Sequence, residues 1–245
     1  MTNIYVLMPV KNEEGRYLQA CLNNLGLAFN TWIYDDHSTD RSAYIAREEF
    51  GCNVIRRPDD VPSFIEDESA FRGDFWRQFV DQSGVTEEDW ILALDADEFL
   101  SNGALAYNNL LALTSGDDVT YAIKKHEIFK VVGNEAYKRM DGYWDRVFTP
   151  RFFKFKKDYK WPDGKMGCGC TPKYAIKKEI RVLRDPSIMH MGYAVRSDRQ
   201  EKYQRYIDKP GHNLDHIKSI ISPSMKLKKI SWVPPYDLWG NIVDG

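Results

Sequence analysis

Short apolar runs alternate with amphipathic segments through the first 115 residues of the chain. Ile4–Met8, Thr31–Tyr34 and Trp90–Leu94 are almost wholly apolar, as is typical of strands inside a parallel sheet. Between them, apolar residues recur at helical spacing. This alternation predicts an open α/β sheet. The other expected elements are a strand at Asn53–Arg56 and helices over about 17–29, 41–49 (with Asp40 as its N-cap) and 65–82.

The pattern changes after Asp117. Three strands are predicted there without helices between them, so the second half is expected to be mixed α+β: Val119–Ile123, Glu127–Val132 and Arg151–Phe155. A helix is predicted at Asp198–Ile207, with Asp198 as its N-cap.

No Gly/Ser-rich linker separates the two halves. We therefore expect one domain over residues 1–222, divided at about residue 115. Residues 223–245 form a C-terminal arm that either wraps the domain or is partly disordered.

Composition is that of a globular chain. Hydrophobic residues make up 43% and charged residues 29%, which argues against disorder. The net charge of −2 gives no indication of nucleic-acid binding. A basic leader and a long apolar run are both missing, so we expect neither a signal peptide nor a membrane span and place the protein in the cytoplasm. Cys168-x-Cys170 has no second Cys/His pair at zinc spacing, so free thiols are expected.

Acidic and polar residues follow three of the predicted strands. They are Pro9-Val10-Lys11-Asn12-Glu13, then Asp35 to Asp40, then Asp95-Ala96-Asp97-Glu98. Ligands of open α/β sheets bind at the carboxyl ends of strands. Carboxylates gathered there repel one another unless a cation or a hydrogen-bonding ligand lies among them. Asp95 and Asp97 are two residues apart and can address one site, and their oxygens suit Mg²⁺ or Mn²⁺ bridging to a diphosphate.

Other phosphate-binding sequences are missing. The chain has neither G-x-G-x-x-G after its first strand nor G-x-x-x-x-G-K-[ST] anywhere, so it has no glycine-rich phosphate cradle. A diphosphate at this edge would then need a metal. The alternatives are that Asp35-Asp36 caps the following turn and that Asp95-x-Asp97 is a solvated turn.

These three segments, in this order, resemble the landmarks of family 2 glycosyltransferases with the GT-A fold. The resemblance covers about the first 115 residues, which would be the nucleotide-sugar-binding half, and leaves 116–222 as the acceptor half. It implies an inverting transferase that uses a UDP- or GDP-sugar and Mn²⁺ or Mg²⁺. By that analogy Asp36 hydrogen-bonds the base, Asp95 lies near the ribose and Asp97 ligates the metal.

Further nucleotide-site residues are expected around these. By the same analogy Pro9 and Asn12 shape the nucleotide pocket mostly through their backbone, and Glu13 belongs to the same segment. Arg72 could reach the diphosphate, since Arg suits phosphate geometry. The alternative for Arg72 is a surface ion pair with Asp74 or Glu68.

A second resemblance lies in the other half. Met189-His190-Met191-Gly192-Tyr193, followed by Arg199-x-x-Lys202-Tyr203, is similar to the H-x-G-Y … R-x-x-K-Y segment of small bacterial family 2 enzymes. It implies that His190 supplies a further metal ligand, and imidazole suits Mn²⁺-like ions.

The catalytic base is open because the sequence departs from the family here. Close relatives often carry a His-Glu pair after a W-x-G segment, whereas Trp161-Pro162-Asp163-Gly164 runs into Lys165. An inverting displacement needs a carboxylate within reach of the acceptor hydroxyl. Asp163 ranks first because it follows a Trp that could stack on a sugar ring. The other candidates are Asp145, Asp141 and Glu98.

The leading hypothesis is therefore a metal-dependent glycosyltransferase, with a role in surface polysaccharide or other glycan synthesis. The alternatives are a non-catalytic sugar-nucleotide or glycan-binding module of the same fold and, less favoured, a sugar nucleotidyltransferase. The latter would need a glycine-rich, basic loop after the first strand, which Pro9–Glu13 does not provide.

The charge is unevenly distributed. Arg57–Glu98 holds 13 acidic and 3 basic residues, whereas Arg151–Arg184 holds 11 basic and 3 acidic. The basic segment lies in the acceptor half, so we expect an anionic acceptor or a peripheral contact with an anionic inner membrane surface. The alternative is a solvated basic face.

Overall fold

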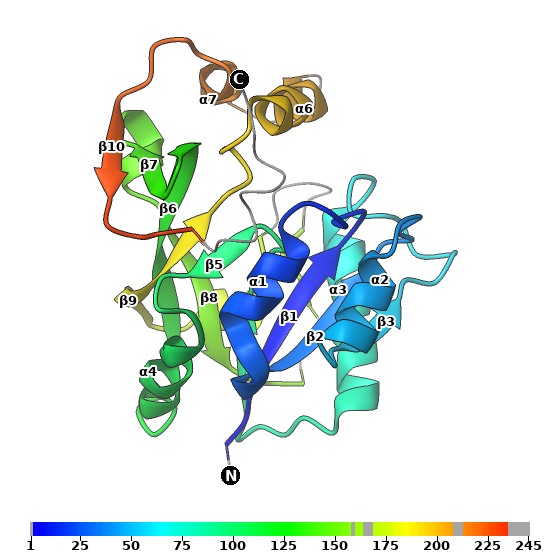
Figure 1. The fold of residues 1–245 in the computed structure, drawn as a ribbon. Coiled ribbons are helices and arrows are strands. Elements are labelled where there is room, and N and C mark those ends of the chain that lie inside the picture. Colours follow the sequence, from blue (N-terminus) through cyan, green and yellow to red (C-terminus); the bar gives the residue numbers. More distant parts are fainter. Residues whose placement is uncertain (1, 158–159, 164–168, 208–212, 235–245) are drawn as a thin grey trace.

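A ten-stranded sheet organises the part of the chain that the structure describes (Figure 1). The structure, a computed structural model, describes residues 2–157, 160–163, 169–207 and 213–234. The main strand order is β10-β7-β6-β8-β4-β1-β2-β3, and β9 pairs with β5 and β6. Strands β4, β1, β2 and β3 are mutually parallel, whereas β8 joins β4 in antiparallel orientation.

The strands and helices expected in the first half are confirmed, except for the N-cap of the second helix. They are β1 (Ile4–Val10), α1 (Leu18–Leu25) with a 3-10 turn (Gly26–Ala28), β2 (Asn30–Asp35), α2 (Ser42–Tyr44) continuing as a π-helical turn (Ile45–Glu49), β3 (Asn53–Arg56), α3 (Glu68–Ser83) and β4 (Trp90–Ala93). Arg41 and not Asp40 is the N-cap residue of the second helix, while Asp40 Oδ1 accepts from the Ser42 amide (2.9 Å). The third helix begins at Glu68 because Asp67 caps it, accepting a hydrogen bond of 3.0 Å from the Ala70 amide.

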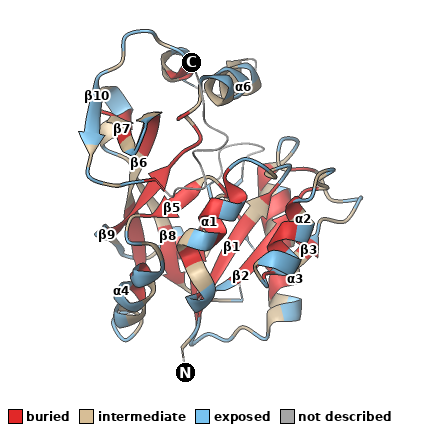
Figure 2. Ribbon diagram, viewed as in Figure 1, coloured by how far each residue is buried: buried red, intermediate tan, exposed pale blue. Residues whose placement is uncertain are grey.

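Alternate residues of β1 pack into two different layers. Ile4, Val6 and Met8 belong to the core beneath α1, while Tyr5 and Leu7 belong to the aromatic core beneath α3. Both faces of this strand are therefore buried, as Figure 2 shows for the central strands. Burial on both faces explains why these strands read as continuous apolar runs.

Residues 98–113 complete the first half with β5 (Glu98–Leu100), a 3-10 turn (Gly103–Leu105) and α4 (Ala106–Leu113). The second half is mixed, as expected. Its elements are β6 (Thr120–Val132), β7 (Glu135–Arg139), a 3-10 turn (Gly142–Asp145), β8 (Phe148–Lys154), α5 (Lys173–Ile176), β9 (Ile180–His190), α6 (Arg196–Ile207), α7 (Leu214–Ile220) and β10 (Leu227–Ile230). Several details differ from the prediction. One strand, β6, replaces the two expected over 119–132, and α6 begins at Arg196, so Asp198 lies within its first turn. The sequence pattern does not predict β5, α4, β7, α5, β9, α7 or β10.

The predicted fold class, a parallel α/β sheet flanked by helices with a mixed second half, is confirmed. Within 223–245, residues Leu227–Ile230 pair with β7, and 235–245 lie outside the described residues. Cys21, Cys52 and Cys170 are free thiols, and Cys168 falls outside the described ranges. Among the described helices, none has the length and apolarity needed to span a bilayer.

Candidate functional site

The three acidic strand ends converge at one edge of the sheet. Because β1, β2 and β4 are parallel neighbours, their carboxyl ends meet there. The Asp36 amide donates to the Val10 carbonyl (2.8 Å), and the Leu94 amide donates to the Leu7 carbonyl (3.1 Å). Asp36 and the Asp95–Glu98 turn therefore lie on either side of the β1 end.

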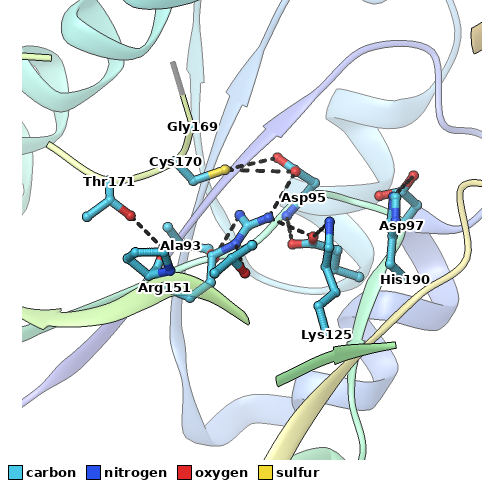
Figure 3. Close-up of polar contacts among 12 residues, drawn as sticks. Ala93, Asp95, Asp97, Lys125, Arg151, Gly169, Cys170, Thr171 and His190 are labelled. Atoms are coloured by element: carbon cyan, nitrogen blue, oxygen red, sulfur yellow. Dashed lines mark hydrogen bonds and ion pairs between the residues drawn. The ribbon is translucent and has the colours of Figure 1, made fainter. Parts of the chain in front are cut away.

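Strand pairing brings His190 to Asp97. The last residue of β9, His190, is in register with Glu98 of β5, and the Met191 amide donates to the Asp97 carbonyl (2.8 Å). His190 Nε2 consequently lies 3.2 Å from Asp97 Oδ2 (Figure 3). The two residues that the sequence predicts as metal ligands are thus direct neighbours, although they are 93 positions apart along the sequence as numbered.

A buried carboxylate holds the other nitrogen of His190. Glu127 of β6 is in register with His190, and its Oε2 contacts His190 Nδ1. Lys125 Nζ pairs with Glu127 Oε1 at 3.0 Å. Burial lowers the pKa of His190, but Glu127 and Asp97 outweigh it and raise that pKa to about 8. Although burial opposes ionisation of Glu127, its pKa is held below the usual range by His190 and Lys125.

Lys202 of α6 completes this group. Its Nζ lies 3.3 Å from Asp97 Oδ2 and 3.5 Å from His190 Nε2, and 4.6 Å from the centre of the Tyr193 ring. Burial alone would raise the pKa of Asp97, but His190 and Lys202 hold it well below the usual range. We call Asp97, His190 and Lys202 the charge triad.

Asp95 lies between two buried arginines. Arg72 Nη2 is 3.4 Å from Asp95 Oδ1. Arg151 Nη2 is 3.5 Å from Oδ2, and Figure 3 shows Arg151 beside Asp95. Burial opposes ionisation of Asp95, yet Arg151 and Arg72 together keep its pKa below the usual value. The Cys170 thiol lies 3.8 Å from Oδ1, and its pKa is raised by burial to about 12. Arg72 also binds Glu68 (2.8 Å), so that pair exists but is buried instead of on the surface.

Glu98 is engaged on both oxygens. It is fully buried, Oε1 accepts from Arg151 (2.7 Å) and Oε2 accepts from the Asp95 amide (3.0 Å). Lys125 Nζ lies 3.6 Å from Oε1. Glu98 therefore braces the turn that carries Asp95 and Asp97.

Both carboxylate oxygens of Asp36 also accept hydrogen bonds. The residue is 1% exposed, and its oxygens accept from Arg57 Nε (2.6 Å), Lys11 Nζ (3.4 Å) and the Phe64 amide (3.3 Å). In this arrangement the carboxylate orders Arg57 and Lys11 and the segment that follows β3.

The β1 end is shaped by its backbone. Pro9 pairs with Tyr34 of β2. Asn12 has a φ of 53°, and its Oδ1 accepts from the Thr39 amide (2.8 Å), which ties the β1 loop to the β2 loop. Glu13 faces Arg16, with 3.7 Å between Oε2 and Nε.

The other candidate bases lie apart from these contacts. The Asp163 side chain is 94% exposed and pairs with Lys173 (2.9 Å). Asp145 accepts from Lys138 (2.9 Å), and Asp141 binds Arg139. Trp161 is buried, and its Nε1 donates to the Gly169 carbonyl (3.0 Å), so its ring belongs to the core around Trp76.

Several residues of this site were not singled out by the sequence. Each is a cation, an acid or a thiol whose role depends on a distant partner: Lys125, Glu127, Arg151, Cys170 and Lys202. Lys125 and Glu127 carry one available signal, since residues two apart on a strand share a face. Lys202 belongs to the R-x-x-K-Y segment, where no function was assigned to it.

The donor set for the predicted Mn²⁺ or Mg²⁺ ion is small. Among the described residues, no three His, Cys, Asp or Glu side chains form a group that could hold a metal ion. Asp97 and His190 offer two donors, and the Lys202 ammonium lies within 3.5 Å of both. Lys is a cation without an acceptor atom. These residues do not fit a divalent cation while Lys202 keeps its place.

Comparison with known proteins supports the fold alone. No family model and no curated protein sequence matches the chain. The solved structure of S. aureus TarS 1–349 in complex with UDP is similar over 90% of this chain and 70% of that one, with 15% identity and a TM-score of 0.50.

Two more distant structural neighbours match smaller parts. A 4-diphosphocytidyl-2C-methyl-D-erythritol synthase matches 63% of this chain and 76% of its own, with 13% identity and a TM-score of 0.37. A mannose-6-phosphate isomerase from Helicobacter pylori matches 55% of each chain, with 13% identity and a TM-score of 0.33.

Proposed function

We propose that the protein is an inverting glycosyltransferase of family 2, which moves a sugar from a nucleotide-diphosphate donor to an acceptor hydroxyl. The observation that carries this proposal is the carboxyl edge of the sheet, where Asp95, Asp97, His190 and Lys202 lie together beside the end of β1. The fold likeness to TarS, whose structure holds UDP, supports a nucleotide ligand.

The chain's own residues hold this edge in a fixed arrangement. Arg72 and Arg151 fix Asp95 for contact with the donor's ribose, and Glu98 braces the turn from below. Lys11 and Arg57, oriented by Asp36, place two positive charges at the neighbouring strand end. We place the donor nucleotide at this carboxyl edge of the sheet, next to Asp95, Lys11 and Arg57.

The reaction is a single displacement at the anomeric carbon. The acceptor oxygen forms a bond to C1, and the bond from C1 to the diphosphate oxygen breaks, with its electron pair leaving on the nucleoside diphosphate. The acceptor proton passes to a carboxylate base. Of the candidates, Glu98 has both oxygens occupied and fits a positioning role, whereas Asp163 and Asp145 stay predictions for the base.

The basic segment of the acceptor half is largely paired within the molecule. Lys154, Lys156, Lys173, Lys178 and Arg181 each form an ion pair with an Asp or Glu of this chain. An anionic acceptor or membrane surface therefore stays a prediction of the sequence.

A screen of nucleotide sugars tests the proposal. UDP-glucose, UDP-N-acetylglucosamine and GDP-mannose are added to the full chain, followed by thermal melting and by detection of UDP or GDP released without an acceptor. A donor at 100 times its Kd adds about 2.7 kcal/mol of stability. For a chain of this size that corresponds to a shift in Tm of roughly 5–10 °C.

Matched variants place the effect at the proposed site. Asp97→Asn should lose both the shift and donor hydrolysis, while Asp81→Asn, on the solvent side of α3, should keep them. If a nucleotide sugar stabilised the protein but no UDP or GDP were released, with or without an acceptor, the result would favour the binding-module alternative. Formation of a nucleotide sugar from UTP and a sugar 1-phosphate would favour the nucleotidyltransferase.

A further inference from the structure

The acidic edge of the sheet is neutralised by cations of the protein itself. Asp36 faces Arg57 and Lys11, Asp95 faces Arg72 and Arg151, and Asp97 faces His190 and Lys202. The sequence suggested that these carboxylates need a cation among them, and the fold supplies two for each. Among these cations, Lys202 lies at the place predicted for the metal.

The Lys202 head group occupies a confined position. Its side chain is 16% exposed, between Asp97 at 18% and His190 at 9%. The Tyr193 ring covers its other side. The ammonium is therefore held among Asp97, His190 and Tyr193 instead of projecting into solvent, as a lysine on an exposed helix normally does.

Gly192 leaves the room that this head group needs. A Cβ at position 192 would lie 2.0 Å from Lys202 Nζ, 2.2 Å from Asp97 Oδ2 and 2.8 Å from His190 Nε2. Any larger residue would collide with all three members of the charge triad. The glycine of the H-x-G-Y segment thus has a steric reason that is independent of the nucleotide.

We infer that Lys202 supplies the positive charge that binds the diphosphate of the donor, at the position where the sequence predicts a divalent cation, and that Gly192 admits it there. The inference rests on the proposed function. Lysine is a compact cation on a flexible stem, so its ammonium can reach a diphosphate oxygen while staying beside Asp97. As the C1–oxygen bond breaks, negative charge grows on the leaving diphosphate, and a fixed ammonium stabilises it.

A purely structural role for Lys202 makes a different prediction. In that case the ammonium only balances the charge of the buried Asp97. Its loss would lower the stability of the fold and reduce the affinity for all ligands equally. If the ammonium instead contacts the diphosphate, its loss should reduce the affinity for nucleoside diphosphates more than the affinity for monophosphates. In that case the wild type should also bind diphosphates without added metal.

Calorimetric titration of the full chain with UDP and UMP, and with GDP and GMP, separates these roles. Each titration is run in EDTA and again with MnCl₂. We expect the wild type to bind the diphosphate in EDTA, with Mn²⁺ changing Kd less than about 3-fold. Lys202→Gln should lose at least about 10-fold in diphosphate affinity and much less for the monophosphate. Mn²⁺ should then recover part of the loss, because Asp97 and His190 are freed of the ammonium.

Companion variants keep the test independent of one substitution. Lys202→Arg keeps the charge and should lose less than Lys202→Gln. Gly192→Ala keeps Lys202 but places a Cβ against all three members of the charge triad, 2.0 Å from Lys202 Nζ, and should also show a selective loss of diphosphate affinity. Arg205→Gln, one turn further along α6 and paired with Glu201, is the control and should bind like the wild type.

Three outcomes would overturn the inference. Equal loss of diphosphate and monophosphate affinity would assign Lys202 a structural role. Wild-type binding that disappears in EDTA and returns with Mn²⁺, with Lys202→Gln unchanged, would restore the metal and leave the proposed function intact. Failure of the wild type to bind UDP and GDP under either condition would overturn the proposed function itself.

Discussion

Glu13 is a carboxyl group for which the fold makes ionisation unfavourable. Its side chain is 17% exposed, and within the described structure its Oε2 has no hydrogen-bond partner. Burial raises its pKa to about 7; Arg16 opposes this increase, and nearby Asp97 adds to it. The unfolded chain releases this proton near pH 4.5, so the folded state holds a proton that the unfolded state has lost.

Stability should therefore fall as pH rises through this window. The contribution of protonated Glu13 is complete below pH 4.5 and is lost by about pH 7. Glu13→Gln removes the titration, so its stability relative to wild type should increase by about 1–3 kcal/mol between pH 4.5 and pH 8. Urea denaturation of both proteins across this range measures the difference.

Glu88→Gln provides the control for that experiment. The Glu88 side chain is 80% exposed, so its substitution should give a difference from wild type that barely changes with pH. If Glu13→Gln behaved in the same way, Glu13 would have an ordinary pKa in the folded protein.

At the residue scale, the site could be predicted where several polar residues follow one apolar strand. Asp95 and Asp97 stand out because a buried strand delivers both to its end. Glu127 and Lys202 do not, because a single acid on a strand or a single base on a helix looks like any solvated charge. Only the pairing of β6 with β9 and the packing of α6 bring them to His190.

Strand β10 adds to the sheet residues that follow the domain expected over 1–222. Leu227–Ile230 pair with Arg139–Ala136 of β7 and cover that edge, which is otherwise open to pairing with other chains. Trp232 follows, and its ring lies 5.9 Å from that of Phe99. Residues 227–232 are thus anchored by both backbone and side chain.

Trp232→Ala should release this anchor. The ring is partly buried against the main core, so we expect a loss of about 1–3 kcal/mol, less than for a fully buried Trp. Val233 lies beside it and is 59% exposed, so Val233→Ala should stay within about 0.5 kcal/mol of wild type. Thermal or urea melts of the two variants measure both values, and equal effects would mean that Trp232 is not an anchor.

Element prediction succeeded where burial alone decides the pattern. The runs that became β1, β2 and β4 are buried on both faces, so they read as strands without any knowledge of their neighbours. The strands of the second half cannot be recognised in this way. β6 was predicted as two strands because the polar residues 124–126 interrupt its apolar pattern.

Tertiary partners explain why β6 continues. Lys124 Nζ contacts the Asp145 carbonyl, and Lys125 Nζ pairs with Glu127 and Glu98. The charges that interrupt the sequence pattern are compensated by Glu127 of the same strand and by Glu98 and Asp145 of other elements. A pattern of apolar and polar positions cannot contain that information.

At the scale of the whole molecule, the two oppositely charged segments are joined. Arg151 binds Asp95 and Glu98, and Lys154 pairs with Glu88. The two charged segments therefore partly neutralise each other where they meet, across the β4–β8 junction.

The same junction makes the halves depend on each other. β8 (Phe148–Lys154) pairs with β4, so a strand of the second half closes the β4 edge of the parallel sheet. Trp76 of α3 packs against Phe153, Phe155 and Trp161, all from the second half. The aromatic core beneath α3 is incomplete without them.

A fragment of residues 1–115 should therefore not fold by itself. It would leave β4 unpaired on one side and expose the aromatic core around Trp76. Asp95 and Glu98 would also lose Arg151, their cationic partner. We expect the fragment to lack the near-UV circular dichroism of its tryptophans and to show no cooperative urea transition, while the full chain unfolds in one transition seen alike by fluorescence and far-UV signals. A cooperative transition in the fragment would instead make the nucleotide half a separate folding unit, and the acceptor half an addition to it.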